Sequence, residues 1–472
     1  MDFKLLRIAF ALLLPLLWVR EVWAVDCPQE DYELTTQAEV DALGATGCDS
    51  ISGNLRIRDS TDITNVDGLA NITSVEGSLL IYRNDALTNL DGLANITSVE
   101  GSLSIYRNDA LTNLDGLANI TSVGGGLYIA GNGALTNLDG LANITSVESS
   151  LDIKSNFALT NLDGLANLTS VGSYLHIRYN FALTNLDGLA NITSVEGSLL
   201  IYDNVALTNL DGLANLTSVG GYLYIVNSGL TNLDGLANLT SVGGYLSIQD
   251  NYFLANLDGL ANLTSVGEGL WIEYNKALAN LDGLANLTSI GEALFIYYNS
   301  SLTNLDGLAN ILSVRGDLVV FENNALTNLD GLANINSVGG DLDIRGNRYL
   351  TNCRGVAPVL GWPKGPPDDS VDRGITLENN ATGCNSIEEI LDGYSDALPE
   401  IVALRLMNTA QGFLGSSSED TDKEIPPAAR EAPAKDTQDP QEPNAIPALP
   451  MLGLFILSGL LGLFGIRRLA HR

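Results

Sequence analysis

The residues of this chain that could do chemistry recur at a single spacing. One aspartate recurs in every repeat, and if the repeats stack, these carboxylates lie about 5 Å apart and repel one another. Bound Ca²⁺ would relieve that repulsion. Each repeat supplies only one regular acid, however, and no second column of ligands, so we expect no metal site. We expect Asp91 to cap a turn through its carboxylate, with Gly92 adopting a positive φ. The Asp-Gly pair recurs every 24 residues, with one step of 23, at Asp67, Asp91, Asp115, Asp139, Asp163, Asp187, Asp211, Asp234, Asp258, Asp282, Asp306 and Asp330.

Residues suited to catalysis are scarce. The sequence has two histidines, His176 and His471, and neither stands in a Ser–His–Asp or metal-ligand constellation. Catalysis would need a local cluster of acids and bases that breaks the uniformity of the repeats. Parallel β-solenoids include polysaccharide lyases, so an enzyme is the alternative class. We predict no catalytic residue and no cofactor.

Aromatic residues crowd positions that differ from one repeat to the next. Such positions are free of the constraint that keeps the other residues uniform, so they are candidates for a contact surface. Exposed aromatic side chains with acids nearby suit stacking on sugar rings or anchoring a protein partner. The alternative is that these residues cover strands because aromatic residues favour strands. The predicted ligand-binding residues are Tyr224, Trp271, Tyr274, Phe295, Tyr297 and Tyr298.

A solenoid must position these residues, because a fixed period of this length is typical of stacked coils. Leu79 and Ile81 alternate with outward residues, which indicates a short strand. Leucine, isoleucine or valine then recurs every third residue from Leu87 to Val99, which indicates a chain that keeps turning around an apolar axis. One asparagine per repeat, beginning with Asn84, is predicted to form a buried ladder that satisfies backbone groups in the turns. A coil cannot bury its apolar side alone, so the array needs caps at both ends.

The repeat resembles a known family. Leu79-Leu80-Ile81-Tyr82-Arg83-Asn84 followed by Leu87-Thr88-Asn89-Leu90-Asp91-Gly92-Leu93 is similar to the receptor L domain, a relative of leucine-rich repeats. The resemblance spans about residues 51–352. It implies a mainly β, right-handed parallel β-solenoid of about twelve 24-residue coils, with one short strand per face per coil. Growth-factor binding does not follow, because the uniform repeats lack the neighbouring Cys-rich modules of the eukaryotic receptors. An internalin-like leucine-rich repeat is the alternative.

The start of the chain reads as an export signal. Residues 1–24 combine a positive region, a short apolar stretch and small residues before a cleavage point at Ala24. Four cysteines lie only at the edges of the repeat array, and in an exported chain they are predicted to form two disulfides. The predicted pairs are Cys27–Cys48 and Cys353–Cys384, within an N-terminal cap (25–50) and a C-terminal cap (353–412).

The end of the chain reads as an anchor. Residues 413–444 have the composition of a disordered linker, and 445–472 include an uncharged apolar run long enough to cross a membrane. The arginines that follow place the C-terminus in the cytoplasm before processing. Ile446-Pro447-Ala448-Leu449-Pro450, the apolar run and Ile466-Arg467-Arg468-Leu469 together resemble bacterial sorting signals read by exosortase-type enzymes. The resemblance implies a sorting peptidase as partner and cleavage near the proline motif. The alternative is a simple single-span anchor.

Charge and modification motifs narrow the function further. The net charge of −33 excludes a nucleic-acid partner, because phosphate would be repelled. Asn71-Ile72-Thr73 and nine equivalents match the N-glycosylation pattern, but their periodicity indicates repeat residues first. We therefore predict an exported, cell-surface or envelope-associated module for adhesion or recognition. It would bind an extracellular glycan or protein. The alternative is a structural surface or matrix component without a specific ligand.

Overall fold

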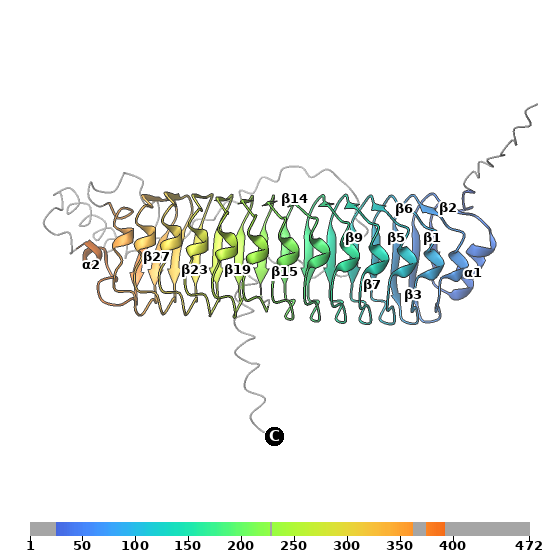
Figure 1. Ribbon diagram of the computed structural model, residues 1–472, viewed down its shortest axis with the longest axis horizontal. Helices are drawn as coiled ribbons and strands as arrows, with labels where there is room; N and C mark the ends of the chain where they lie inside the picture. Colours follow the sequence, from blue (N-terminus) through green and yellow to red (C-terminus); the bar gives the residue numbers. More distant parts are fainter. Residues whose placement is uncertain (1–24, 227–228, 362–373, 392–472) are drawn as a thin grey trace, which may run out of the picture. The chain divides into compact units, whose positions relative to one another are not determined.

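The computed structural model describes residues 25–226, 229–361 and 374–391. The chain divides into two units, Met1–Gln411 and Gly412–Arg472, and all described residues belong to the first. In this unit the chain winds into stacked coils of about 24 residues (Figure 1). Each coil contains a long strand, a turn, a 3-10 helix and a short strand. The predicted mainly β solenoid is confirmed.

The long strands form one parallel sheet of 15 strands in the described residues. Because each coil adds one strand, the order in the sheet follows the order in the chain. The strands are β1 (Tyr32–Leu34), β3 (Leu55–Ser60), β5 (Leu79–Asn84), β7 (Leu103–Tyr106), β9 (Leu127–Ala130), β11 (Leu151–Lys154), β13 (Leu175–Arg178), β15 (Leu199–Tyr202), β17 (Leu223–Val226), β19 (Leu246–Gln249), β21 (Leu270–Glu273), β23 (Leu294–Tyr297), β25 (Leu318–Phe321), β27 (Leu342–Arg345) and β28 (Ile375–Glu378).

The short strands form a second parallel sheet, of 13 strands in the described residues. Each contributes one buried valine or isoleucine to the interior. They are β2 (Ser50–Ile51), β4 (Ser74–Val75), β6 (Ser98–Val99), β8 (Ser122–Val123), β10 (Ser146–Val147), β12 (Ser170–Val171), β14 (Ser194–Val195), β16 (Ser218–Val219), β18 (Ser241–Val242), β20 (Ser265–Val266), β22 (Ser289–Ile290), β24 (Ser313–Val314) and β26 (Ser337–Val338).

The remaining side of each coil is a 3-10 helix of three residues. This differs from the one strand per face that the family resemblance implies. The helices are η1 (Asp67–Leu69), η2 (Asp91–Leu93), η3 (Asp115–Leu117), η4 (Asp139–Leu141), η5 (Asp163–Leu165), η6 (Asp187–Leu189), η7 (Asp211–Leu213), η8 (Asp234–Leu236), η9 (Asp258–Leu260), η10 (Asp282–Leu284), η11 (Asp306–Leu308), η12 (Asp330–Leu332) and η13 (Arg354–Val356).

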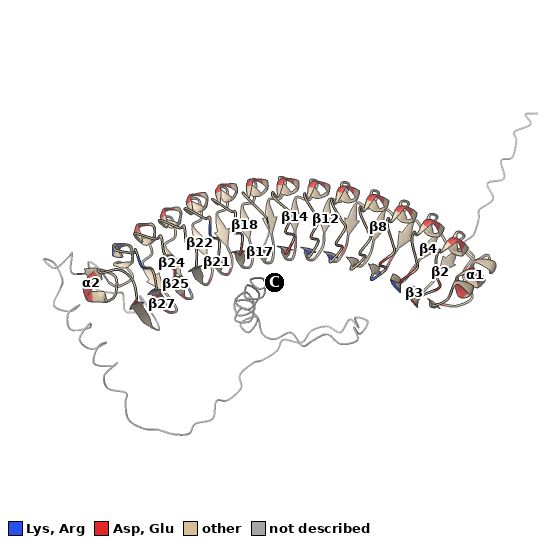
Figure 2. Ribbon diagram, turned by 90° about the horizontal axis from the view of Figure 1, so that it is seen from below, with Lys and Arg blue, Asp and Glu red and all other residues tan. Residues whose placement is uncertain are grey.

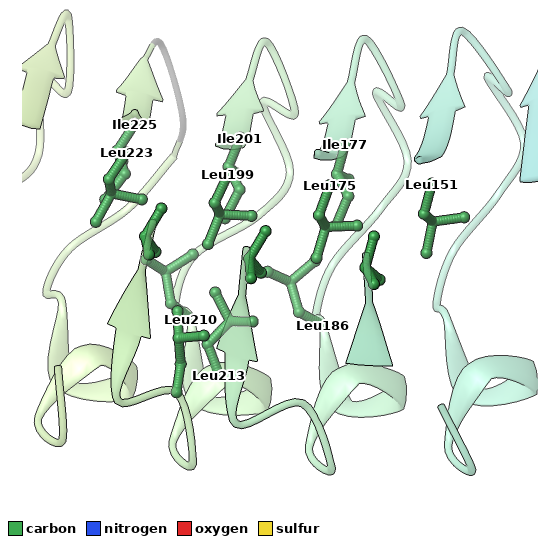
Figure 3. Close-up of a cluster of buried hydrophobic side chains, with 14 of the residues drawn as sticks. Leu151, Leu175, Ile177, Leu186, Leu199, Ile201, Leu210, Leu213, Leu223 and Ile225 are labelled. Carbon is green, nitrogen blue, oxygen red and sulfur yellow. The ribbon is translucent and has the colours of Figure 1, made fainter. Parts of the chain in front are cut away.

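The apolar residues of each coil share one interior, as the periodicity predicted. In the coil that begins with β5, the strand residues Leu79 and Ile81 and the five apolar positions from Leu87 to Val99 are each at most 1% exposed. Figure 3 shows strand residues such as Leu199 and Ile201 facing Leu210 and Leu213 across this interior. Each coil therefore buries its apolar residues against its own walls and against the adjacent coils.

The predicted asparagine ladder is present in the described turns that follow the long strands from β5 onward. Asn108 donates from Nδ2 to the carbonyl oxygen of Ile81 at 2.9 Å. Its Oδ1 accepts the backbone N–H of Asn84 at 3.2 Å. The ladder continues past the regular repeats to Asn380, whose Oδ1 accepts the backbone N–H of Asn347. Asn227, another predicted member, lies outside the described residues.

The expectation for Gly92 is wrong. Its backbone has no positive φ; instead, a Cβ atom on it would lie 1.9 Å from the carbonyl oxygen of Val66 in the preceding coil. Gly116 and the later equivalents up to Gly331 show the same close approach. Glycine is required here because two coil backbones touch. The positive φ occurs instead at the residue before the ladder asparagine, such as Arg83.

The expectation for Asp91 is also wrong, because its carboxylate does not cap the helix. The N-cap residue is Leu90, which makes no side-chain cap bond, and the backbone N–H of Asp91 donates to Oδ1 of Asn89 at 3.1 Å. Asp91 occupies the first position of η2 and is exposed. A carboxylate at the positive end of even a short helix is favourable and needs no ligand.

The Asn-x-Thr motifs act as repeat residues. Asn95 donates from Nδ2 to the carbonyl oxygen of Ala70 at 2.7 Å, and the Thr97 hydroxyl donates to the carbonyl oxygen of Thr73 at 3.3 Å. Both side chains are exposed but hydrogen-bond to the neighbouring coil. The structure does not test whether these sites are glycosylated.

The N-terminal end is closed by helix α1 (Gln37–Ala45). Thr36 and Glu39 form a reciprocal capping box at its start, and Val40 and Leu43 are buried. The predicted disulfide Cys27–Cys48 is present beside it. Helix and disulfide together cover the apolar interior of the first coil.

The C-terminal end is closed in a similar way. The predicted disulfide Cys353–Cys384 is present, and β28 pairs in parallel with β27. Helix α2 (Ile387–Leu391) follows, and the Ser386 hydroxyl accepts the backbone N–H of Glu389 at 3.1 Å. The rest of the expected C-terminal cap lies outside the described residues.

The stacked coils form an arc (Figure 2). The long-strand sheet follows its inner side, and the 3-10 helices with their aspartates follow the outer side. The predicted signal peptide (1–24), linker (413–444) and membrane or sorting segment (445–472) lie outside the described residues. Among the helices that are described, none has the length and hydropathy needed to cross a bilayer.

Candidate ligand-binding face

The inner sheet presents three columns of variable side chains. In each long strand two apolar residues point inward, and the residue between them and the one after them point outward and are mostly half-buried. A third variable residue follows, in the left-handed conformation. Because the strands are in register, equivalent residues of successive coils lie side by side. The variable residues therefore form one continuous surface on the outward side of the long-strand sheet, as predicted.

The predicted residues lie in these columns over the later coils. In the first column Tyr224, Ser247, Trp271 and Phe295 are successive partners. The Trp271 and Phe295 rings meet edge to face, with centroids 5.2 Å apart. Tyr224 stands two strands from Trp271, with the small Ser247 between them.

The second and third columns complete a cluster. Tyr297 contacts Phe295 at 5.5 Å and Phe321 at 6.3 Å between ring centroids. Tyr274 and Tyr298 stack in parallel at 4.6 Å, and Tyr298 meets Phe321 at 5.1 Å. Five of the six predicted residues are thus brought together with Phe321. We call this cluster the aromatic patch: Trp271, Tyr274, Phe295, Tyr297, Tyr298 and Phe321.

The sequence prediction missed two tyrosines at the edge of the patch. Tyr245 lies 5.8 Å from Trp271 between ring centroids, and Tyr222 lies 5.4 Å from Tyr245. Both precede their strands, at a position that is serine in earlier coils such as Ser78 and Ser102. That departure from the repeat was the available signal.

Two patch residues have an unfavourable backbone. Tyr274 and Tyr298 both have φ of 54°. A bulky residue in the left-handed region costs roughly 1–2 kcal/mol relative to the usual conformation. Gly131 and Gly346 occupy the same position in other coils, where they adopt this conformation without that cost. The fold thus accepts glycine at this position, and tyrosine is not needed to build the turn.

The patch surrounds an acidic group. Burial, and then the nearby Asp250 carboxylate, raise the pKa of Glu273 to about 7. Burial raises the pKa of Tyr274 to about 12, with neighbouring Tyr298 adding to the effect. Burial likewise raises the pKa of Tyr297 above its usual range. These hydroxyls stay protonated at neutral pH and can donate hydrogen bonds, whereas Glu273 changes its charge there.

His176, one of the two histidines, is a half-buried surface residue. Its ring stacks on Tyr174 with centroids 4.2 Å apart. Burial lowers its pKa to about 4, against the opposing effect of Asp152. Asp152 is instead paired with Arg178 at 2.9 Å. The group around His176 is thus an internally paired network, and His471 lies outside the described residues.

A groove of about 580 Å³ lies at the edge of the early coils. Its arginines, Arg83 and Arg107, face three aspartates of the same groove, and Arg83 pairs with Asp59 at 3.3 Å. Across residues 25–226, 229–361 and 374–391, no three His, Cys, Asp or Glu side chains are grouped to hold a metal ion. The aromatic patch is therefore the strongest candidate site on this face.

Comparison with known proteins gives a family match. The family model of the receptor L domain matches residues 47–139, which cover the first coils and end before the patch. No curated protein shows a significant sequence match to the chain. The receptor L domain is a ligand-binding repeat family without enzymatic activity. The chain is a repeat protein whose first coils match this domain and whose later coils continue the same repeat.

Proposed function

We propose that this protein is an extracellular recognition module that binds a protein ligand through the aromatic patch. The main support for this proposal is the patch itself. Six aromatic rings contact one another on the outward side of the long-strand sheet, and the apolar interior behind that sheet is formed without them. Clusters of Tyr, Trp and Phe are typical of the central residues of protein interfaces. The match to a ligand-binding family supports the same class.

The geometry favours a protein over a glycan. A sugar ring stacks on the open face of an aromatic ring. In the patch Tyr274 and Tyr298 cover one another's faces, and Trp271 and Phe295 meet edge to face. The rings therefore offer mainly edges and hydroxyl groups, which suit the mixed apolar and polar surface of a protein. Glycan binding is an outcome of the test below.

The proposed location is the cell surface. Two disulfides close the ends of the coil array, and disulfides persist in oxidising compartments. The predicted export signal and anchor support this location from the sequence. We propose that the anchor, through an exosortase-type peptidase or as a single span, holds the coils outside the cell.

The test compares patch and control variants against arrays of extracellular proteins and of glycans. We expect specific protein binding that is reduced at least tenfold by Trp271→Ala and by Tyr297→Ala, because truncating central aromatic anchors costs about 2 kcal/mol or more. Phe181→Ala is the matched control, since Phe181 is an exposed aromatic residue that stacks on Phe157 in coils that precede the patch.

Two results would count against the proposal. Binding that Phe181→Ala reduces as much as Trp271→Ala would place the ligand elsewhere. Failure of every protein and glycan to bind would favour the structural surface or matrix component. Specific glycan binding lost in Trp271→Ala would keep the site and change the ligand class.

A further inference from the structure

Glu273 differs from the comparable acids of the inner sheet by having no cation beside it. Asp152 is paired with Arg178 at 2.9 Å, and Asp343 with Arg345 at 3.1 Å. Both acids are mostly buried, and each has a guanidinium supplied from the same face. Glu273 is also half-buried, but among the described residues no Lys, Arg or His nitrogen lies within 4.0 Å of its carboxylate. Glu273 is thus a half-buried strand carboxylate of this face without an ion pair in the described part of the chain.

The side chains on the strand next to Glu273 and Trp271 are polar and buried. Gln249 is the direct partner of Glu273 on the adjacent strand and is 5% exposed. Ser247, the partner of Trp271, is 1% exposed. Both lie close enough to the Tyr224 hydroxyl to interact with it through hydrogen bonds. Neither side chain carries a charge, so neither neutralises the Glu273 carboxylate.

The rings around Glu273 complete a cation-binding environment. On this side aromatic rings already lie beside cations of the chain itself: Arg345 lies 5.0 Å above Phe321 at one end of the patch, and Lys276 lies 4.5 Å above Tyr252. Between these pairs, Trp271, Tyr274 and Tyr297 flank Glu273 along and across the strands. A cation placed there would gain the attraction of the Glu273 carboxylate and of the tyrosine hydroxyl oxygens nearby.

We infer that the ligand supplies the missing cation: a lysine or arginine side chain of the partner protein docks against Glu273 within the aromatic patch. This inference rests on the proposed function and adds the chemistry of the partner. The acidic net charge of −33 would also draw a basic partner toward the protein before contact.

Binding of a cation at this position must depend on pH. Asp250 is the carboxylate that acts on Glu273. The tyrosine hydroxyls that interact with Glu273 are those of Tyr297 in β23, of Tyr298 directly after β23, of Tyr224 in β17 and of the adjacent Tyr274. Lys276 acts on Asp250 and lowers its pKa, opposing the effect of burial there. Only ionised Glu273 attracts a cation, so affinity rises with pH. With a pKa of about 7 the ionised fraction increases about tenfold between pH 6 and pH 8.

The experiment uses the full chain and a peptide library with arginine, lysine or citrulline at one fixed position between varied residues. Citrulline has the shape of arginine without its charge. We expect arginine and lysine peptides to bind the parent protein at pH 8 about tenfold more tightly than at pH 6. We expect Glu273→Gln to remove this pH dependence and to weaken binding at pH 8 about tenfold. Asp258→Asn, which removes one exposed carboxylate from η9 on the outer side, is the matched control.

A stability measurement separates recognition from a structural role. The folded-state pKa of Glu273 lies above its unfolded value, so its ionisation disfavours the folded state as pH rises from about 4.5 through 7. Glu273→Gln should therefore raise the melting temperature at pH 8 more than at pH 4.5, even though binding weakens. A residue needed only for folding would lower both.

The outcomes distinguish this inference from the proposed function. Equal binding of citrulline and arginine peptides, or no effect of Glu273→Gln, overturns the inference. If Trp271→Ala still abolishes protein binding in that case, the proposed function stands alone. If no lysine or arginine peptide binds and Trp271→Ala changes nothing on the protein array, both fail.

Discussion

At the scale of single residues, glycine meets two different structural constraints in this chain. Gly140 belongs to the Asp-Gly column, and a Cβ atom there would lie 1.8 Å from the carbonyl oxygen of Leu114. Gly131 lies in the turn after β9 with φ of 64°, and its nearest neighbour would be 3.6 Å away. Gly140 is needed for space, and Gly131 for its backbone angle.

Because of these two constraints, we expect Gly140 to tolerate substitution poorly and Gly131 to tolerate it well. Gly140→Ala should lower the free energy of unfolding by about 1–3 kcal/mol or more, because two backbones must separate. Gly131→Asn should stay within about 1 kcal/mol of the parent, because asparagine tolerates a positive φ. Urea unfolding of the two variants measures the difference. Equal losses would contradict the steric explanation of the Asp-Gly column.

At the scale of elements, each long strand separates two tasks by alternation. Its inward residues, such as Leu270 and Ile272, are fully buried and build the interior. Its outward residues and the left-handed residue after it are free to vary, because they contact one another on the outward side of the sheet and take no part in the interior. The ladder asparagine that follows, Asn275 in this coil, anchors the turn with bonds to Ile248 and Asn299. A constant frame thus carries a variable face.

The left-handed position offers a direct test of selection for binding. Tyr274→Asn removes a strained tyrosine backbone, worth about 1–3 kcal/mol, and loses a stacked pair worth about 0.5–1.5 kcal/mol. We expect the melting temperature to stay near that of the parent or to rise, while ligand binding on the protein array falls. Ser155→Asn, at the same position of an early coil with φ of 56°, should change neither. A large loss of stability in Tyr274→Asn would instead indicate a structural tyrosine.

At the scale of the whole molecule, the array behaves as a stack in which each coil contacts its neighbours. The two sheets run along its length, and α1 and α2 lie at opposite ends of the described coils (Figure 1). The aspartates of the 3-10 helices follow the outer side of the arc, which leaves the inner side for variable residues (Figure 2). Stability in such an array is approximately a sum over coils and their interfaces.

A coil can therefore be removed without changing the architecture. Deleting residues 132–155 joins Gly131 to Asn156, which occupies the ladder position of Asn132 one coil later. We expect the 24-residue deletion to keep the circular dichroism of the parent, with a modest loss of stability. Deleting residues 132–143 should prevent cooperative folding, because one coil would lose its ladder asparagine, Asn132, and its 3-10 helix, η4, and could not close. Equal behaviour of the two deletions would contradict the stacked-coil architecture.

Much of this protein followed from its sequence. The 24-residue period, the alternation at Leu79 and Ile81 and the leucines at every third position predicted the solenoid and its interior. The Asn84 ladder and both disulfides were predicted as well. Repeats make such inference reliable, because a residue that recurs in every coil must serve a role common to all coils. Predictions on residues 1–24 and 413–472 remain predictions from the sequence.

The tertiary structure decided what depends on contacts between coils. Gly92 was misassigned because the atom that excludes a Cβ there, the carbonyl oxygen of Val66, belongs to another coil. Asp91 was misassigned because the side chain that bonds to the backbone at the start of η2 is that of Asn89. The sequence placed aromatic residues on the inner face, but only packing showed which rings meet and that Glu273 lacks a cation. Periodicity records what every coil shares, whereas a site arises where neighbouring coils differ, and its geometry is set across the sheet.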